Sequence, residues 1–285
     1  MDGFLFIDKP KGITCQRLLN MIKKKFNIDK VGHSGTLDPN TTGIMLIAIG
    51  KATKLLSLLN EHDKSYIATI TFGYDSESLD FDSNITNDID MNVNINDIKK
   101  SLDNFLKQDT QIPPMTSAIK INGMKLYEYQ RKNIDIELEP RNVKLYNYEI
   151  LSDLRYFNNH QEFDLKIDVS KGYYVRSLAR DLGVSLNGCA LLHELRRIKI
   201  GDYGIELCKK IEDIKESDII SIFDFFKLDI VEVDDYMKRL VLNGVTLDER
   251  NTNKHGIFYV KNNCDIIAIY KETLNNIYKP IIIFK

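Results

Sequence analysis

The densest group of residues that could do chemistry runs from Gly32 to Pro39 and has the sequence GHSGTLDP. Two glycines flank small hydroxyl side chains, and the single carboxylate, Asp38, precedes a proline that restricts it to an extended backbone. A phosphate-binding loop of the Walker type would need a lysine at a fixed place, and none stands there. From spacing alone, the segment is compatible with a structural turn or with a site that aims one carboxylate.

This loop resembles a signature of the TruB-type tRNA pseudouridine synthases, which isomerise uridine 55 in the T-loop of tRNA. Other segments between Phe4 and about Gly204 resemble further motifs of that family, in the family's order. Ser34, Leu46 and Thr116 depart from the usual family residues, which are Thr, Pro and an aromatic residue. The matching segments are Asp8–Gly12 (DKPKG), Thr42-Gly43, Gly50–Lys54 (GKATK), Lys64–Tyr66 (KSY), Pro113–Ala118 (PPMTSA), Lys125–Tyr129 (KLYEY), Ser170–Leu178 (SKGYYVRSL) and Leu195–Arg197 (LRR).

The resemblance implies that Asp38 is the catalytic nucleophile. Pseudouridine formation breaks the N-glycosidic bond, rotates the uracil and rejoins it through C5, and a carboxylate can assist by bonding to the sugar or the base. The mechanisms considered for the family differ in whether the carboxylate attacks C1′, attacks C6 of the ring or helps to form a glycal. The sequence does not decide among them, and the resemblance implies no cofactor.

Two further residues gain catalytic roles from the resemblance. Arg176 is expected to pair with Asp38 and to keep the carboxylate ionised in a partly buried site. Tyr66 is expected to stack on the target base and to take or relay the C5 proton. By type alone, Arg176 would also fit a surface position on a helix, and Tyr66 a core position in a strand.

Substrate binding is expected to involve base flipping, because the bond to be broken is inaccessible while the base is stacked. The T-loop is partly unstacked, so its shape and its phosphates can supply recognition. By resemblance, His33 lies near the space left by the flipped nucleotide, Tyr174 and Leu195 line the uracil pocket, and Lys9 and Pro10 support the catalytic loop. The side chains expected near phosphates are Lys120, Lys125, Arg131, Lys132, Arg196, Arg197 and Lys199.

The elements that must position these residues are mostly strands. The alternation of apolar residues from Tyr66 to Phe72 predicts a strand with two distinct faces. Thr14 is a predicted N-cap for a helix with Leu18 and Ile22 on one face. Asn122-Gly123 predicts a type I′ hairpin turn. Other strands are expected over 3–8, 43–49, 142–151, 162–169 and 189–200, and other helices at 52–59, from Ile98 and from Val175, whereas the acidic segment 74–96 is expected to be a surface excursion.

Strands that dominate, with helices interspersed without strict alternation, predict an α+β fold with a mixed, mostly antiparallel central sheet. By resemblance this is the pseudouridine synthase fold. After Phe226 the pattern changes to short strands separated by polar turns, expected at 256–260, 266–270 and 277–284. We therefore expect a catalytic domain over residues 1–228 and a small β-rich domain over 229–285. The second resembles the PUA-type RNA-binding domain of the family.

The composition favours a soluble globular protein, with 43% hydrophobic and 28% charged residues in a chain of 285. The longest apolar run, Ile44 to Ile49, is far shorter than the roughly 20 residues that span a bilayer, so a membrane protein is excluded. The first residues lack the basic region of a secretory signal. The four cysteines lie far apart, without metal-ligand spacing. A cytoplasmic protein with reduced cysteines and no metal is expected.

The net charge of −2 hides an uneven distribution. Residues 74–104 carry eight acids and two lysines, a net charge of −6. Residues 1–33, with seven bases and three acids, and residues 171–200, with six bases and two acids, each carry +4. These two segments could form one positive face for nucleic acid, or they could be ordinary solvated surfaces.

The expected partner is tRNA, bound through its T-loop and T-stem by a monomer. One rival hypothesis is an RNA-folding chaperone that has lost catalysis, which the presence of Asp38, Tyr66 and Arg176 together argues against. A nearer rival is a synthase of the Cbf5 type that depends on a guide RNA. The absence of an N-terminal extension and of a fuller C-terminal domain argues against it, so no guide RNA is expected.

Overall fold

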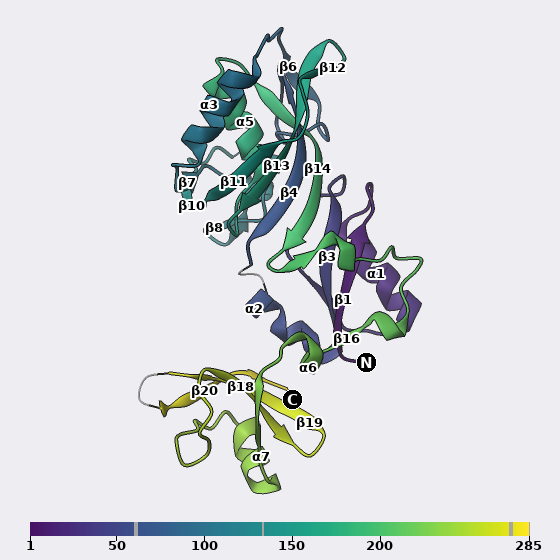
Figure 1. Cartoon of the computed structure of the whole chain (residues 1–285), viewed down its shortest axis with the longest axis vertical. Coiled ribbons are helices and arrows are strands. Elements are labelled where there is room, and N and C mark those ends of the chain that lie inside the picture. The colour runs from purple at the N-terminus through teal and green to yellow at the C-terminus, as the bar shows by residue number, and fades with distance from the viewer. Residues whose placement is uncertain (60–61, 133, 274–275, 285) are drawn as a thin grey trace.

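A ten-stranded sheet forms the centre of residues 1–228 in the computed structural model, which describes residues 1–59, 62–132, 134–273 and 276–284 (Figure 1). Its main path runs β11-β13-β4-β14-β3-β1-β16, and β12, β15 and β2 pair alongside β13, β14 and β3. Every described pair is antiparallel except β14 with β3. The predicted α+β class and the mostly antiparallel sheet are therefore confirmed. The strands are β1 (Gly3–Lys9), β2 (Val31–Ser34), β3 (Thr42–Ile49), β4 (Lys64–Phe72), β11 (Leu145–Ile150), β12 (Arg155–Phe157), β13 (His160–Val169), β14 (Ala190–Ile200), β15 (Tyr203–Gly204) and β16 (Ile220–Ser221).

Helices α1, α3 and α5 lie against the sheet, and each is close to its predicted place. Helix α1 (Cys15–Phe26) begins after Thr14, whose hydroxyl accepts a hydrogen bond of 3.1 Å from the Arg17 backbone N–H. Helices α3 (Ile95–Phe105) and α5 (Val175–Ser185) lie side by side against the half formed by β11, β13 and β4 (Figure 1). The helix expected over 52–59 is mostly a 3₁₀ turn, η1 (Gly50–Leu55), followed by the short α2 (Leu56–Leu59).

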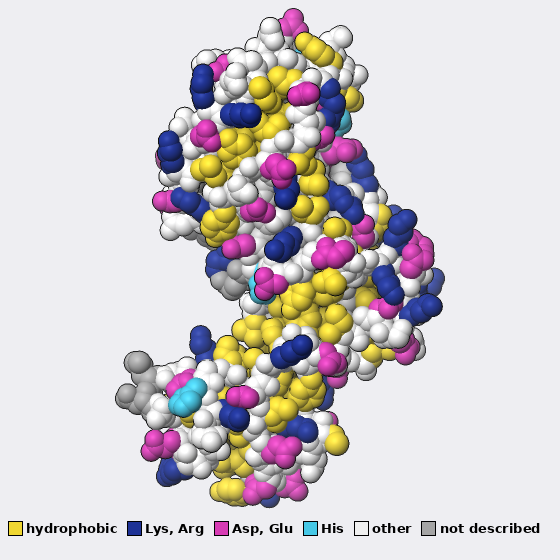
Figure 2. Space-filling model, viewed as in Figure 1, with side chains coloured by type: hydrophobic (Ala, Val, Ile, Leu, Met, Phe, Trp, Pro, Cys, Tyr) yellow, Lys and Arg dark blue, Asp and Glu magenta, His cyan; other side chains and the backbone are white. Residues whose placement is uncertain are grey.

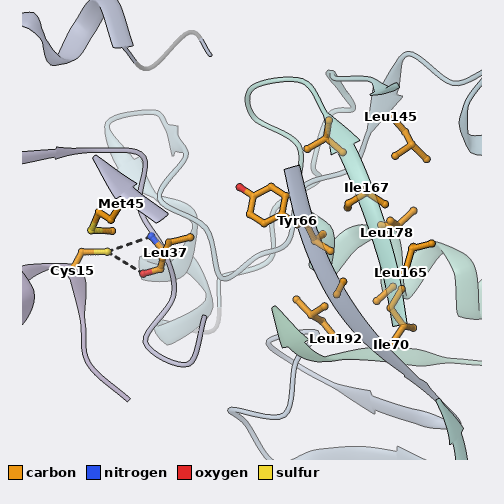
Figure 3. Packing of buried hydrophobic residues seen from close by; sticks show 14 of the residues in the cluster. Cys15, Leu37, Met45, Tyr66, Ile70, Leu145, Leu165, Ile167, Leu178 and Leu192 are labelled. Carbon is orange, nitrogen blue, oxygen red and sulfur yellow. Dashed lines mark hydrogen bonds between the residues drawn. The ribbon is translucent and has the colours of Figure 1, made fainter. Parts of the chain in front are cut away.

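The core lies on both faces of the sheet. In β1, Leu5 and Ile7 belong to the cluster beneath α1 and α5, whereas Phe4 and Phe6 belong to the opposite cluster, as the period of two requires. Figure 3 shows part of the first cluster, in which Tyr66 lies between residues near β4, such as Ile70 and Leu165, and Cys15, Leu37 and Met45. The sheet is thus anchored on both sides, which gives the loops at its edges a rigid support.

The strands after residue 228 form a separate four-stranded sheet in the order β17-β18-β19-β20. Tyr259, Ile269 and Ile282 from this sheet join the same core cluster as Phe4 and Phe6. Hydrophobic side chains accordingly gather at the junction of the two sheets (Figure 2). The three predicted strands are confirmed, but β17 and α7 were not predicted. The elements are β17 (Asp229–Glu232), α7 (Asp235–Leu242), β18 (Ile257–Asn262), β19 (Asp265–Glu272) and β20 (Tyr278–Ile283).

Short elements fill the connections. The predicted hairpin is present, with φ of 50° at Asn122 and 83° at Gly123. The segment 74–96 is not wholly a surface excursion, because β5 and β6 pair there and Tyr74 and Ser76 are buried. No helix of the described residues is long and apolar enough to span a membrane. The short elements are β5 (Tyr74–Ser76), β6 (Ile85–Asp88), β7 (Thr110–Gln111), β8 (Lys120–Ile121), β9 (Met124–Lys125), α4 (Leu126–Arg131), β10 (Arg141–Asn142), η2 (Ile205–Leu207), η3 (Glu216–Asp218) and α6 (Ile222–Phe225).

Candidate active site

The loop that carries Asp38 joins β2 to β3 and is held from below by a buried lysine. The Lys9 ammonium donates hydrogen bonds to the carbonyls of Pro39 and Thr41, both at 2.8 Å, and to that of Pro10 at 3.2 Å. Burial lowers the pKa of Lys9, while the nearby Asp38 carboxylate opposes that shift. Because Pro39 and Thr41 closely follow Asp38 in the chain, Lys9 holds the backbone next to the carboxylate.

A second buried cation holds the other side of the loop. Arg197 on β14 is 1% exposed, and its Nε and Nη2 atoms donate to the carbonyls of Ile44 at 2.9 Å and Gly35 at 3.2 Å. Gly43 must be glycine here, because a Cβ would lie 2.1 Å from the Arg197 carbonyl oxygen. Arg197 was expected near phosphates, and its guanidinium is buried and bonded to carbonyls.

Asp38 and Arg176 meet as predicted. Arg176 Nη2 lies 3.1 Å from Asp38 Oδ2, and the two side chains are 9% and 44% exposed. The guanidinium also donates to the Ser78 carbonyl at 2.9 Å and to the Thr116 carbonyl at 3.2 Å. Arg176 is therefore held by two other segments, and its Nη2 group also faces the half-exposed carboxylate.

Asp80 is a part of this network that the sequence reasoning missed. Its Oδ2 lies 3.5 Å from Arg176 Nη1, and its side chain is 15% exposed. Burial raises the pKa of Asp80, and the charge of Arg176 acts against this shift. Asp80 belongs to the acidic segment that was expected on the surface. Only the string of acids and serines at 75–83 pointed to it, and that composition is equally typical of a solvated loop.

Asp38 and Arg176 open onto a cavity of about 530 Å³, within the range of roughly 300–1,000 Å³ that is usual for ligand pockets. Tyr66 lies near the start of β4, lines the cavity and is 8% exposed; its ring points toward the side of Leu37 (Figure 3). The lining residues are His33, Gly35, Thr36, Leu37, Asp38, Thr41, Lys64, Tyr66, Thr116, Ser117, Ala118, Gly172, Tyr173, Tyr174, Val175, Arg176, Leu195 and Arg197.

One end of the pocket is cationic. Burial and the charge of Arg197 together lower the pKa of Lys64 to about 8 and lower the pKa of His33 below its ordinary value. The Nδ1 atom of His33 and the hydroxyl of Ser117 are buried without a hydrogen-bond partner among the described residues. Two polar atoms on the pocket wall are thus left for a ligand or solvent.

Six of the predicted site residues line this one pocket: His33, Asp38, Tyr66, Tyr174, Arg176 and Leu195. The other two, Lys9 and Pro10, lie beside the loop that carries Asp38. Lys64, Thr116 and Ser117 were noticed in the sequence only as parts of motifs, without a place in the site. Nothing in their types distinguishes them from residues elsewhere in the chain.

The chemistry available to the pocket is that of one carboxylate beside an arginine, facing an aromatic wall. Within the described residues, no three histidine, cysteine or acidic side chains are grouped so that they could hold a metal ion. The four cysteines are free. The arrangement suits attack by a carboxylate on a planar, uncharged ring or its sugar, with the surrounding cations available for a polyanionic substrate.

Comparison with known proteins places this geometry in a family. Residues 23–175 match the model for TruB family pseudouridylate synthase (N terminal domain). The curated protein tRNA pseudouridine synthase B of Acholeplasma laidlawii is 38% identical over 282 residues, covering 98% of each chain. The protein of the same name from Borreliella burgdorferi is 36% identical and covers 99% of each chain.

Solved structures show the same fold. The chain superposes on one in a Cbf5-Nop10-Gar1 complex with a TM-score of 0.69 and 22% identity, covering 99% of this chain and 84% of that one. A structure of an H/ACA RNP bound to a substrate RNA gives a TM-score of 0.67 and 21% identity, with 99% and 85% covered. At these identities the likeness concerns the fold, and it extends over both sheets.

Proposed function

This chain belongs to the TruB family of pseudouridylate synthases, and from that premise we propose that it converts uridine 55 in the T-loop of tRNA to pseudouridine. The observation that carries the proposal is the ion pair of Asp38 with Arg176 at 3.1 Å, which opens onto the aromatic pocket. The curated relatives that are named for this class of reaction align over nearly the whole chain.

The reaction is an isomerisation and balances without a second substrate. The C1′–N1 bond breaks, the uracil turns in the pocket, and a C1′–C5 bond forms. The proton that leaves C5 is matched by a proton that N1 gains. Asp38 is the nucleophile that assists the first step, and Arg176 keeps its carboxylate ionised and oriented. No oxidant, reductant or cofactor enters this balance.

The pocket walls supply positioning. Tyr66 and Tyr174 offer aromatic faces to the flipped uracil, and Leu195 closes the apolar side. Tyr66 takes or relays the C5 proton. His33 stands at the cationic end, where the T-loop strand would leave the pocket, and Lys9 and Pro10 hold the catalytic loop.

A tRNA substrate also fits the surroundings of the pocket. Lys64 and Arg176 bring positive charge to it, and the last turn of α1 carries Lys23, Lys24 and Lys25. Basic side chains lie near α1 in Figure 2, with acidic side chains among them. Phosphate contacts of this kind add affinity without reading the sequence, so recognition would rest on the shape of the T-loop.

We further propose that residues 229–285 are a small RNA-binding domain that contacts the acceptor stem. Their own sheet, docked through Tyr259 and Ile282, supports a second unit beside the catalytic one. The enzyme then acts in the cytoplasm, as a monomer and without a guide RNA. A T-arm hairpin should bind more weakly than full tRNA if the stem is contacted, and equal affinities would contradict this assignment.

The experiment that tests the function is pseudouridine mapping on an unmodified tRNA transcript incubated with the purified protein alone. Conversion confined to the T-loop uridine, without a cofactor or guide RNA, is the expected result. Tight binding with no conversion would instead support an RNA chaperone. Conversion that requires an added guide RNA would support a guide-dependent synthase of the Cbf5 type.

A further inference from the structure

The loop of residues 77–83 contacts Arg176 and the loop that carries Asp38. The Ser78 carbonyl accepts a hydrogen bond of 2.9 Å from Arg176, and Asp80 lies 3.5 Å from the same guanidinium. Asp82 accepts a hydrogen bond from Asn40, two residues after Asp38 in the catalytic loop. The 77–83 loop therefore bridges the segment that carries Asp38 and the helix that carries Arg176.

The backbone of the 77–83 loop is held in an unusual conformation. Leu79 has φ of +62°, and the other described non-glycine residues with positive φ are all asparagines. Such a conformation persists only where its surroundings hold it in place. The Ser76 hydroxyl, which donates to the Asp80 carbonyl at 2.6 Å, and the Leu192 N–H, which donates to that of Leu79 at 3.4 Å, supply part of that hold.

Phe81 supplies the rest. It stands between Asp80 and Asp82 in the chain, and its ring contacts a group of rings rather than the pocket. The ring centroids lie 5.4 Å from Tyr74, 4.9 Å from His193 and 6.0 Å from Phe157. His193 is itself fixed by Glu162, whose carboxylate lies 2.9 Å from the imidazole Nδ1. These rings stand on strands of the central sheet and the β5 segment next to it, so they form a rigid socket.

We infer that Phe81 is a positioning residue for the catalytic ion pair, acting through the 77–83 loop that it anchors between the sheet and Arg176. Its ring holds Asp80 and the Ser78 carbonyl against the guanidinium, and Asp82 against the catalytic loop. The inference rests on the proposed function for its kinetic consequences. The anchoring itself can be measured without a substrate.

The test compares Phe81→Ala with the wild type in pseudouridine formation on a tRNA transcript. Loss of the ring should lower kcat by at least tenfold and leave KM for tRNA within about twofold, because the pocket walls stay in place. Phe81→Leu, which keeps an apolar side chain in the socket, should recover most of kcat. The matched control is Tyr156→Ala, which removes a 72% exposed ring from the neighbouring β12 and should behave as wild type.

Hydrogen exchange of the free protein distinguishes a failure of the proposed function from a failure of the inference about Phe81. Phe81→Ala should speed amide exchange in residues 77–83 whether or not tRNA is the substrate. An inactive wild type would sink the proposed function alone, and faster exchange in the variant would still support the anchor. Normal exchange and normal kcat in folded Phe81→Ala would overturn the inference. If Phe81→Ala does not fold, the test uses Phe157→Leu, which loosens the socket from its other side. This variant must show the same loss of kcat. A normal kcat in Phe157→Leu would equally overturn the inference.

Discussion

The ten-stranded sheet and its loops bury charge, whereas the four-stranded C-terminal sheet does not. Lys9, Arg176 and Arg197 are buried around the pocket, two of them bonded only to backbone carbonyls in the contacts described above. Among the described residues after 228, the one buried polar side chain is Asn262. An uncompensated buried charge destabilises the folded state, and each of these cations is accordingly bonded to carbonyls or to a carboxylate.

Buried charge, rather than buried apolar surface, distinguishes the site in this chain. Each sheet packs on a hydrophobic cluster of its own, and neither of these two clusters by itself indicates a functional site. The buried cations all converge on one loop or on the carboxylate that the loop carries. Cations that are buried and yet bonded to carbonyls leave their positive field to act on the pocket rather than being cancelled by an acid.

The largest effect should come from Asp38→Asn, which keeps the shape of the side chain and removes its charge. Product formation should fall by roughly 10³-fold or more, as is usual when a nucleophile is removed. The free energy of unfolding should change little, because the carboxylate is 44% exposed. Single-turnover assays and urea unfolding of the same preparation would check both. Turnover close to wild type would contradict the role of Asp38.

Lys9→Met should have the next largest effect, and here stability should change as well as activity. Three carbonyls would lose a buried donor, which predicts a loss of about 3 kcal/mol in the free energy of unfolding. Urea unfolding would measure it. The matched control is Lys11→Met, because Lys11 lies two residues away and its ion pair with Glu194 is exposed. Equal stability of the two variants would show that Lys9 does not hold the loop.

Some of these features could be predicted from the sequence and others could not. The pattern of β4 and the cap of α1 are local, so periodicity and residue type were enough to predict them. The meeting of Asp38 with Arg176 came from motif resemblance. The contact between Arg176 and Ser78 joins residues 98 apart, and no local pattern encodes such a distance. The same reason explains why the burial of Arg197 was not predicted and why Asp80 was missed.

The buried positive charge at the pocket also predicts a pH dependence through Lys64. Its pKa of about 8 in the folded protein lies below the roughly 10.4 of an unfolded lysine. Between these values the unfolded chain holds a proton that the folded protein has released. Stability relative to Lys64→Met should therefore rise with pH from about 8 to about 10.4. The burial of the charged form opposes folding below that window.

Urea unfolding of the two proteins from pH 7 to pH 10 would measure this difference. Tyrosines and other lysines titrate in both proteins, so their contributions cancel. Lys199→Met serves as the control, because Lys199 lies on β14 beside the site but is exposed. A difference between wild type and Lys64→Met that stays constant with pH would show that the pocket does not shift the pKa of this lysine.

The smallest effect is expected in the C-terminal sheet, at the one side chain there that resembles those of the pocket. Asn262 is 4% exposed, and its amide donates to the Val233 carbonyl at 2.9 Å and accepts from Lys238 at 3.1 Å. Both contacts stay within this part of the chain. Asn262→Ala should therefore lower the free energy of unfolding by about 1–2 kcal/mol and leave kcat unchanged, with the exposed Asn253→Ala as control. If kcat fell as is expected for Lys9→Met, buried polar groups in both regions would support catalysis, and the contrast between the two sheets would not hold.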